Sequence, residues 1–187
     1  MRTEDPLAPA RRNIELKARD PDPDRSSLVC ESLGAKKRPD LVQRDTYFHV
    51  PNGRLKLREE PGGVAHLIGY ERPNRTEERE SRYRIIETEN PTELKAALTD
   101  ALGVVAIVAK QRRLFLWEGA RIHLDRVEML GDFIEFEAIA PPDSNLSSEE
   151  SQIRGLRNAF SIAEADLIDV SYCDLALAGR SVEESSP

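Results

Sequence analysis

Apolar and polar residues alternate strictly in several short segments of the chain. Residues 13–19 read NIELKAR, so every second side chain is apolar and the side chains between them are polar or charged. Successive side chains of a β-strand point to opposite faces, so this segment predicts a strand with one apolar and one charged face. Segments 54–58, 110–112 and 133–137 repeat the two-faced pattern. The chain therefore predicts a sheet in which several strands carry a charged face.

The charged faces allow two interpretations. If they point to one shared interior, that interior holds several cations and a few carboxylates, which suits a polyanion together with a divalent metal ion. The rival is an ordinary antiparallel sheet whose cross-strand ion pairs face water, each pair contributing roughly a few tenths of a kcal/mol. The repetition of the pattern in separate segments favours the shared interior.

The remaining pattern predicts eight strands in hairpin order, with PNG and PGG turn signals between neighbouring strands. The strands are expected at residues 13–19, 41–50, 54–60, 64–72, 81–87, 104–117, 121–127 and 133–140. Helices are expected after the first and fifth strands, ending at Gly34 and Gly103, and from Ser147 onward. Residues 73–80 carry much charge and no apolar anchor, so they are expected to form a mobile loop.

Eight antiparallel strands are enough to close a barrel, which removes exposed sheet edges and encloses a lumen. The fold class predicted is α+β, a closed eight-stranded antiparallel β-barrel with flanking helices. An ordinary small barrel fills its lumen with apolar side chains, whereas this lumen would hold Arg, Lys and Glu. Such a lining is costly unless water and a charged ligand share the space. Residues 13–177 are expected to form a single domain, with flexible tails at 1–12 and 178–187.

Composition narrows the function classes. The 187 residues carry a net charge of −7, which argues against a general binder of nucleic acid or of membrane surfaces. The two cysteines, Cys30 and Cys173, give no support for a disulfide framework. No apolar run approaches the roughly 18 residues that span a bilayer, and the first twelve residues lack the apolar core of a signal peptide. A cytoplasmic location is therefore expected.

The basic residues of the predicted strands are candidate phosphate ligands. Arg side chains grip phosphate oxygens with two donors and Lys supplies a point charge, while no glycine-rich phosphate loop is present. The cations that share a strand face with others of their kind are Lys17, Arg54, Lys56, Arg58, Lys110 and Arg112. Arg72, Arg19 and Arg82 are further candidates.

Carboxylates lie in the first and the last two predicted strands. These are Glu15, Asp125, Glu135 and Glu137. A barrel closes by pairing its ends, so the four groups are expected to converge as oxygen ligands for Mg²⁺ or Mn²⁺. The alternative is that they merely pair with basic neighbours. The three histidines stand alone in the sequence, without a His or Cys at ligand spacing, so no zinc site is expected.

Five segments in the same order resemble the CYTH family, which contains class IV adenylate cyclases and thiamine triphosphatases and is also called the triphosphate tunnel metalloenzymes. They are IELKAR at 14–19, QRDTYF at 43–48, GRLKLRE at 53–59, Lys110 with Arg112, and GDFIEFE at 131–137. The resemblance spans roughly residues 13–177 and includes the closing SYCDL. It implies an eight-stranded tunnel that binds a triphosphate through basic side chains, with a divalent metal held by glutamates.

The resemblance also implies roles for individual residues. Glu15 and Lys17 match the second Glu and the Lys of the family's Glu-x-Glu-x-Lys signature, and with Asp125 they are expected to act in catalysis. Phosphate binding is expected from Lys17, Arg54, Lys56, Arg58, Arg72, Lys110 and Arg112. Metal ligation is expected from Glu15, Glu135 and Glu137. The first Glu of the signature is Asn13 here, which removes a formal charge and weakens one metal position.

Three functions are compatible with this site. The first is an adenylate cyclase of the class IV type that converts ATP into cyclic AMP and pyrophosphate with Mg²⁺ or Mn²⁺. The second is a triphosphatase acting on tripolyphosphate, thiamine triphosphate or another organic triphosphate. The third, suggested by Asn13, is a protein that binds a nucleotide or polyphosphate without turnover. The expected partner is a nucleoside triphosphate or inorganic polyphosphate, not nucleic acid or membrane. A homodimer formed through an outer face of the barrel is a further possibility.

Overall fold

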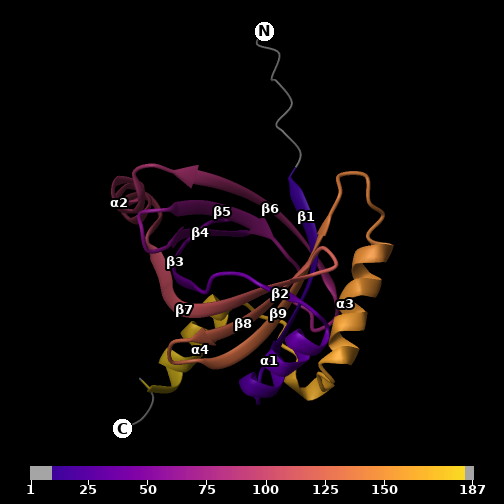
Figure 1. Cartoon of the computed structure of the whole chain (residues 1–187). Coiled ribbons are helices and arrows are strands. Elements are labelled where there is room, and N and C mark those ends of the chain that lie inside the picture. Colours follow the sequence, from indigo (N-terminus) through magenta and orange to yellow (C-terminus); the bar gives the residue numbers. More distant parts are fainter. Residues whose placement is uncertain (1–9, 184–187) are drawn as a thin grey trace.

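The protein is a closed antiparallel barrel with helices against its outer surface (Figure 1). The structure, a computed structural model, describes residues 10–183. Its strands are β1 Arg11–Arg19, β2 Lys36–Lys37, β3 Leu41–Phe48, β4 Arg54–Glu59, β5 Ala65–Glu71, β6 Arg79–Thr88, β7 Val104–Trp117, β8 Ala120–Val127 and β9 Gly131–Ala140. Its helices are α1 Pro23–Ser32, α2 Pro91–Leu102, α3 Ser147–Ala159 and α4 Tyr172–Glu183, with a short 3-10 helix at Glu164–Asp166.

Eight of these strands form the ring, in the order β7-β3-β4-β5-β6-β1-β9-β8, and β8 pairs with β7 to close it. Every pairing in the ring is antiparallel. The first strand of the chain, β1, lies between β6 and β9, so it brings its side chains beside those of the last strand. The predicted fold class is confirmed, because closure gives every ring strand two partners and leaves the alternating side chains either inside or outside.

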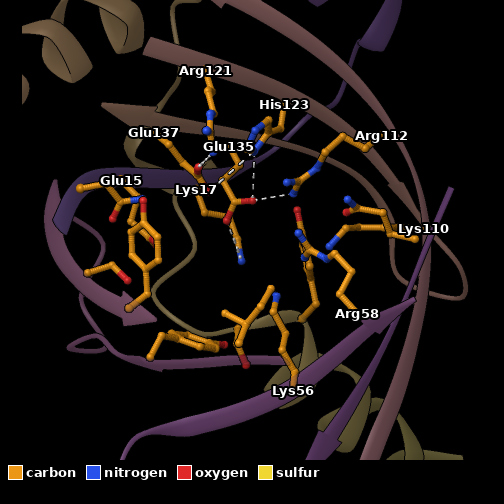
Figure 2. A pocket seen from close by; sticks show the side chains of 18 of the residues that line it. Glu15, Lys17, Lys56, Arg58, Lys110, Arg112, Arg121, His123, Glu135 and Glu137 are labelled. Carbon is orange, nitrogen blue, oxygen red and sulfur yellow. Dashed lines mark hydrogen bonds and ion pairs between the residues drawn. The ribbon is translucent and has the colours of Figure 1, made fainter. Parts of the chain in front are cut away.

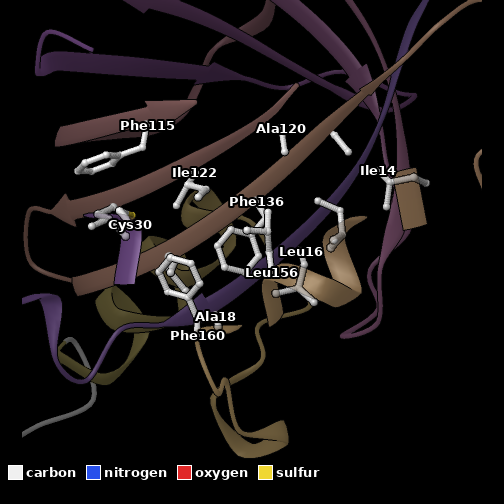
Figure 3. Close-up of a cluster of buried hydrophobic side chains, with 14 of the residues drawn as sticks. Ile14, Leu16, Ala18, Cys30, Phe115, Ala120, Ile122, Phe136, Leu156 and Phe160 are labelled. Carbon is white, nitrogen blue, oxygen red and sulfur yellow. The ribbon is translucent and has the colours of Figure 1, made fainter. Parts of the chain in front are cut away.

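The apolar faces of the strands point outward and are covered by helices. Figure 3 shows Ile14 and Leu16 of β1 and Phe136 of β9 packed against Leu156 of α3 and the nearby Phe160. All five side chains are almost fully buried. A separate cluster forms where α2 covers the outer face of β3, β4 and β5. Burying each of these large apolar side chains contributes about 1.5–3 kcal/mol to the stability of the fold. The apolar layer between the strands and the helices, rather than the lumen, therefore supplies most of the hydrophobic core.

The predicted hairpin turn between β3 and β4 depends on glycine. Gly53 has a φ of 65°, and a Cβ atom at this position would lie 2.8 Å from the carbonyl oxygen of Tyr70. Any other residue would therefore meet both backbone strain and a clash with β5. The close approach fixes the start of β4, which sets the register that sends Lys56 and Arg58 into the barrel.

The structure adds strand β2 and helix α4, and it extends the first and fifth predicted strands. Strand β2, two residues long, pairs with the end of β7. The sequence expectation of an unanchored loop at 73–80 was wrong at its end, because Arg79 begins β6 and is fully buried against Glu15. Strand β1 begins at Arg11 and α4 continues to Glu183, inside the segments predicted as tails. The rest of those two predicted tails, 1–9 and 184–187, lies outside the described residues.

None of the helices within residues 10–183 is both long enough and apolar enough to cross a lipid bilayer.

Candidate functional site

The inside of the barrel contains a cavity of about 410 Å³ with a strongly cationic lining. Among the described residues, eight Lys or Arg and three Glu line it. Figure 2 shows the labelled members of this lining projecting from the ring of strands toward one shared space. The excess of positive charge is held inside a protein whose net charge is −7, so the outer surface carries the compensating acid. A lumen of this sign attracts a small, highly charged anion.

One wall of the cavity is organised by a buried carboxylate, Asp45 of β3. Its side chain is fully buried and accepts hydrogen bonds from Arg58 at 2.7 and 2.8 Å, from Lys56 at 3.0 Å and from Lys110 at 3.2 Å. Burial opposes ionisation of Asp45, but the three cations outweigh burial and hold the pKa of its carboxyl well below the usual value. A single anion therefore gathers three cations from β4 and β7 into one cluster.

Burial disfavours the charged form of the two lysines of this wall. It lowers the pKa of Lys110 to about 7 and that of Lys56 to about 8, because a charged ammonium loses its hydration and Arg58 lies nearby, although Asp45 partly compensates. Three cations held by one carboxylate leave net positive charge on the wall. An anionic ligand would restore that balance and favour the charged lysines.

The facing wall, formed by β1, β7, β8 and β9, carries a second network. Arg112 binds Asp125 through two hydrogen bonds of 2.6 Å and also donates to Glu135 at 2.8 Å. Lys17 lies 3.3 Å from the other oxygen of Glu135 and 3.9 Å above the ring of Tyr172. Burial opposes ionisation of Glu135, yet Lys17, His123 and Arg112 together outweigh it, so its pKa lies well below the ordinary value. Glu135 is thus an anion in the neutral pH range.

The carboxylate of Glu15 accepts hydrogen bonds from two arginines. Arg72 donates to it at 2.6 Å and Arg79 at 3.3 Å. Arg79 is held in turn by the carbonyl oxygens of Arg75 and Ile168. Glu15 therefore orients Arg72 into the cavity from the side of β5 and β6.

A candidate metal-binding group lies between β8 and β9. His123, Glu135 and Glu137 each offer one ligand atom, and these atoms all lie within 4.8 Å of one another. The Nδ1 atom of His123 is 3.6 Å from Glu135 and 4.0 Å from Glu137. It is buried and, among the described residues, has no hydrogen-bond partner. Two carboxylates and an unsatisfied nitrogen at this spacing fit a divalent cation.

The two ends of the cavity differ in character. Ser171 and Tyr172, at the start of α4, line the end near Lys17, and Tyr172 packs edge-on against Phe133. Toward the other end the lining gains apolar side chains, which lie near Arg38 and Arg121. The strand registers bring together there the side chains of Leu41, Ile68, Tyr83, Ile85, Leu114 and Leu116.

The structure brings most of the predicted site residues to this one cavity. Those that line it are Glu15, Lys17, Lys56, Arg58, Arg72, Lys110, Arg112, Glu135 and Glu137. Asn13 lines it as well, and its Oδ1 is buried without a hydrogen-bond partner in the described part of the chain. Four predicted residues lie elsewhere. The further candidates Arg19 and Arg82 are exposed and do not line the cavity. Asp125 sits behind Arg112 and borders a separate outer pocket, and Arg54 lies at the outer end of β4, where it contacts Asn74 and Asp174.

Sequence reasoning did not single out three residues of the site. Asp45 has only the uncharged Gln43 and Tyr47 beside it on the inner face of β3. His123 lies between Arg121 and Asp125 on the inner face of β8, but has no His or Cys at ligand spacing in the sequence. Tyr172 comes from a helix, outside any strand pattern, and reaches Asp125 with its hydroxyl at 2.9 Å. The alternation in β3 and β8 already places Asp45 and His123 on the inner face, and that signal was available.

A family model of the CYTH domain matches residues 11–172. The chain belongs to the CYTH family. Members act on nucleoside triphosphates or polyphosphates and generally depend on a divalent metal. No curated protein matches the chain at a significant level.

Several solved structures share the whole fold. The PH1012 protein of Pyrococcus horikoshii aligns with a TM-score of 0.79 and 25% identity, covering 87% of this chain and 98% of that one. An adenylate cyclase candidate of Vibrio parahaemolyticus gives 0.74 and 19%, with coverage of 90% and 99%. An adenylyl cyclase candidate of Hippeastrum, described as having a dominant triphosphatase activity, gives 0.60 and 16%, with coverage of 90% and 96%. The last two, at these identities, are similar in fold alone.

Proposed function

We propose that this protein is a divalent-metal-dependent enzyme that cleaves a triphosphate inside the barrel, with ATP cyclisation to cyclic AMP and pyrophosphate as its first candidate reaction. The observation that carries the proposal is the lining of the cavity, in which eight cations face three glutamates. A nucleoside triphosphate brings up to about four negative charges, which offsets most of the excess of five positive charges among the eight cations and three glutamates. The cytoplasm, where nucleoside triphosphates are present, is the proposed location.

In this proposal both walls of the cavity bind the phosphate chain, each from one side. Lys56, Arg58 and Lys110 bind the phosphate chain from one side, and Lys17 and Arg112 bind it from the other. Glu135 and Glu137 hold the divalent ion, which supplies neutralisation of charge on the phosphate oxygens. Because the cations are already gathered by Asp45 and Glu135, little reorganisation is needed when the substrate enters.

Cyclisation requires that the enzyme also hold the nucleoside. The apolar side chains toward the end opposite Tyr172, among them Tyr83 and Leu114, offer a surface for a base and ribose. With the triphosphate fixed at the cationic walls, the ribose 3′-hydroxyl attacks the α-phosphorus, the bond from this phosphorus to the oxygen that bridges it to the β-phosphate breaks, pyrophosphate leaves and the hydroxyl proton passes to water. Catalysis in this scheme is mainly positioning and charge stabilisation.

A second candidate reaction is hydrolysis of the terminal phosphate of tripolyphosphate or of an organic triphosphate. The described activity of the Hippeastrum protein, which shares the fold, favours this alternative. The same residues bind the phosphates, and water replaces the ribose hydroxyl as nucleophile. The two reactions differ in product, so they are separable in one assay.

The test is incubation of the protein with ATP and, separately, with tripolyphosphate, each with Mg²⁺ or Mn²⁺. Cyclic AMP with pyrophosphate supports the cyclase, and orthophosphate supports the triphosphatase. The matched pair of variants is Arg58→Ala and Arg44→Ala, because both lie on neighbouring strands but Arg44 points outward and is exposed. We expect Arg58→Ala to lose at least about 100-fold in kcat/KM and Arg44→Ala to keep full activity. No product from either substrate, or equal activity in both variants, contradicts the proposal.

A further inference from the structure

The nitrogen of His123 is the one ligand atom in the candidate metal group that is not an oxygen. His123 on β8 lies directly across from Glu135 on β9, and Glu137 is two residues further along the same strand. This register places an imidazole between two carboxylates on the inner face of the barrel (Figure 2). Its Nδ1 faces Glu135 Oε2 at 3.6 Å and Glu137 Oε1 at 4.0 Å.

The spacing of the three ligand atoms is close to that of a coordination sphere. An ion that binds oxygen and nitrogen at about 2.1 Å separates neighbouring ligand atoms by about 3 Å and opposite ones by about 4 Å. The three atoms here all lie within 4.8 Å of one another, so small rotations of the side chains complete the site. The distances to Nδ1 are, in contrast, too long for hydrogen bonds.

The surroundings leave the imidazole nitrogen unsatisfied and the carboxylate oxygens with spare lone pairs. His123 is 3% exposed, and its Nδ1 has no hydrogen-bond partner in residues 10–183, although buried polar atoms are normally satisfied. Glu137 Oε1 faces His123 while its Oε2 faces Arg121 at 3.7 Å. Glu135 accepts from Arg112 and contacts Lys17, and each carboxylate oxygen has a second lone pair for a metal.

We propose that His123 is a metal ligand together with Glu135 and Glu137, and that its nitrogen makes the site select a divalent transition metal such as Mn²⁺ over Mg²⁺. Mg²⁺ prefers an octahedral shell of oxygen atoms and retains its water, whereas imidazole nitrogen favours transition metals. An all-carboxylate group would not discriminate in this way. The inference rests on the proposed function in that both use the ion held by Glu135 and Glu137.

The decisive measurement is pulsed electron paramagnetic resonance of the wild-type protein with Mn²⁺ alone. A ligating imidazole gives modulation of the electron spin echo by a directly bound ¹⁴N nucleus. We expect this modulation in the wild type. A saturable Mn²⁺ site without nitrogen coupling overturns the proposal, and so does the absence of saturable Mn²⁺ binding. This measurement needs no variant, so it stands even if replacement of a buried histidine prevents folding.

Variants test the selectivity. In His123→Gln and His123→Asp we expect the nitrogen signal to disappear and the ratio of the Mg²⁺ to the Mn²⁺ dissociation constant to fall by about tenfold or more. His49→Gln is the matched control, because His49 is exposed and does not line the cavity, and it should keep both signal and ratio. An unchanged ratio in folded His123 variants overturns the proposal.

Turnover distinguishes this inference from the proposed function. A wild-type protein that cleaves triphosphates but shows no nitrogen coupling overturns only the role of His123. A protein that shows nitrogen coupling and cleaves no triphosphate supports the role of His123 and contradicts the proposed function.

Discussion

At the scale of single residues, Asp45 holds the cations of one wall of the lumen in place. It is the only carboxylate of its wall among the described residues that line or border the cavity there, and it binds Lys56, Arg58 and Lys110 at once. Removing one member of a buried charge cluster leaves the remaining charges uncompensated. Asp45 therefore stabilises this wall without contributing a group that reaches the substrate.

Asp45→Asn tests this role. We expect a loss of about 3 kcal/mol in the free energy of unfolding, because three buried cations lose their counter-charge. Tripolyphosphate should restore more stability to the variant than to the wild type, because the ligand supplies the missing negative charge. Urea denaturation with and without tripolyphosphate measures both effects. The control is Asp40→Asn, since Asp40 pairs with Lys37 at the exposed surface, where such a pair is worth about 0–1 kcal/mol. Equal losses in the two variants would argue against the role of Asp45.

The lowered pKa of Lys110, about 7, predicts a pH-dependent affinity for anions. As the pH rises through 7, the free protein loses the positive charge of Lys110, whereas the bound anion favours the charged form. Binding of tripolyphosphate should therefore weaken by about tenfold or more between pH 6.5 and 8.5 and should take up a proton at the upper end. Isothermal titration calorimetry in two buffers of different ionisation enthalpy measures both quantities.

Lys110→Arg is the control for this prediction, because arginine stays charged throughout this range. The titration of the ligand itself is common to both proteins and cancels in the comparison. The variant should show a flatter pH profile and less proton uptake. If the two profiles coincide, Lys110 does not titrate in the way its burial indicates.

Single residues of the site were harder to predict than the face on which they lie. The alternation along each strand gives the inner or outer face, and so identified Lys17, Lys56 and Glu135 as inward candidates. It does not give distances across the barrel. Strand register and barrel closure bring His123 close to two glutamates and give Asp45 its four hydrogen bonds. A single sequence specifies neither register nor closure.

Secondary structure elements were predicted more completely, because the physical signals are local. Alternation and turn residues identified all eight strands of the ring, and glycine identified the ends of α1 and α2. Strand β2 is too short for alternation to be visible. The start of β6 was missed because Arg79 is anchored by Glu15, 64 residues away in the sequence, and nothing near Arg79 signals a buried partner.

Helix α4 forms part of the floor of the cavity through its first residue. Tyr172 is 3% exposed, donates a hydrogen bond to Asp125 and packs against Phe133 and Lys17. We expect Tyr172→Ala to cost about 3–5 kcal/mol in the free energy of unfolding, because it leaves a large hole between α4 and the barrel. Tyr172→Phe should cost only about 1–2 kcal/mol, since it removes one hydrogen bond and keeps the ring.

Chemical denaturation of both Tyr172 variants, beside the wild type, measures these costs. Circular dichroism of the native states checks that the barrel persists. A Tyr172→Ala variant no less stable than Tyr172→Phe would show that the ring does not seal the floor.

The whole molecule separates an acidic exterior from a cationic interior. The net charge is −7, yet the cavity lining is dominated by Lys and Arg. Buried cations that lack sufficient counter-charge reduce stability, and a ligand that binds only the folded state adds RT ln(1 + [L]/Kd). Multivalent anions should therefore raise the stability of the whole barrel.

At a tripolyphosphate concentration of about 100 times Kd, the added stability is about 2.7 kcal/mol, which corresponds to a rise in Tm of roughly 5–10 °C for a chain of this length. Differential scanning calorimetry without added metal measures it. Orthophosphate at the same ionic strength serves as the control and should raise Tm far less, because it bridges fewer cations. Equal shifts would mean that the lumen senses ionic strength rather than a chain of linked phosphates.

The floor made by Tyr172 and Ser171 has a further consequence for turnover. If the substrate enters with its phosphate tail toward Lys17, the products cannot depart in arbitrary order. The organic fragment, held toward the end opposite Tyr172, leaves first, and the anionic fragment, held by the cationic walls, leaves last. Pyrophosphate would then compete directly with the next substrate molecule, whereas the nucleoside fragment would inhibit weakly, so the rate of the cycle would be limited by departure of the most charged piece.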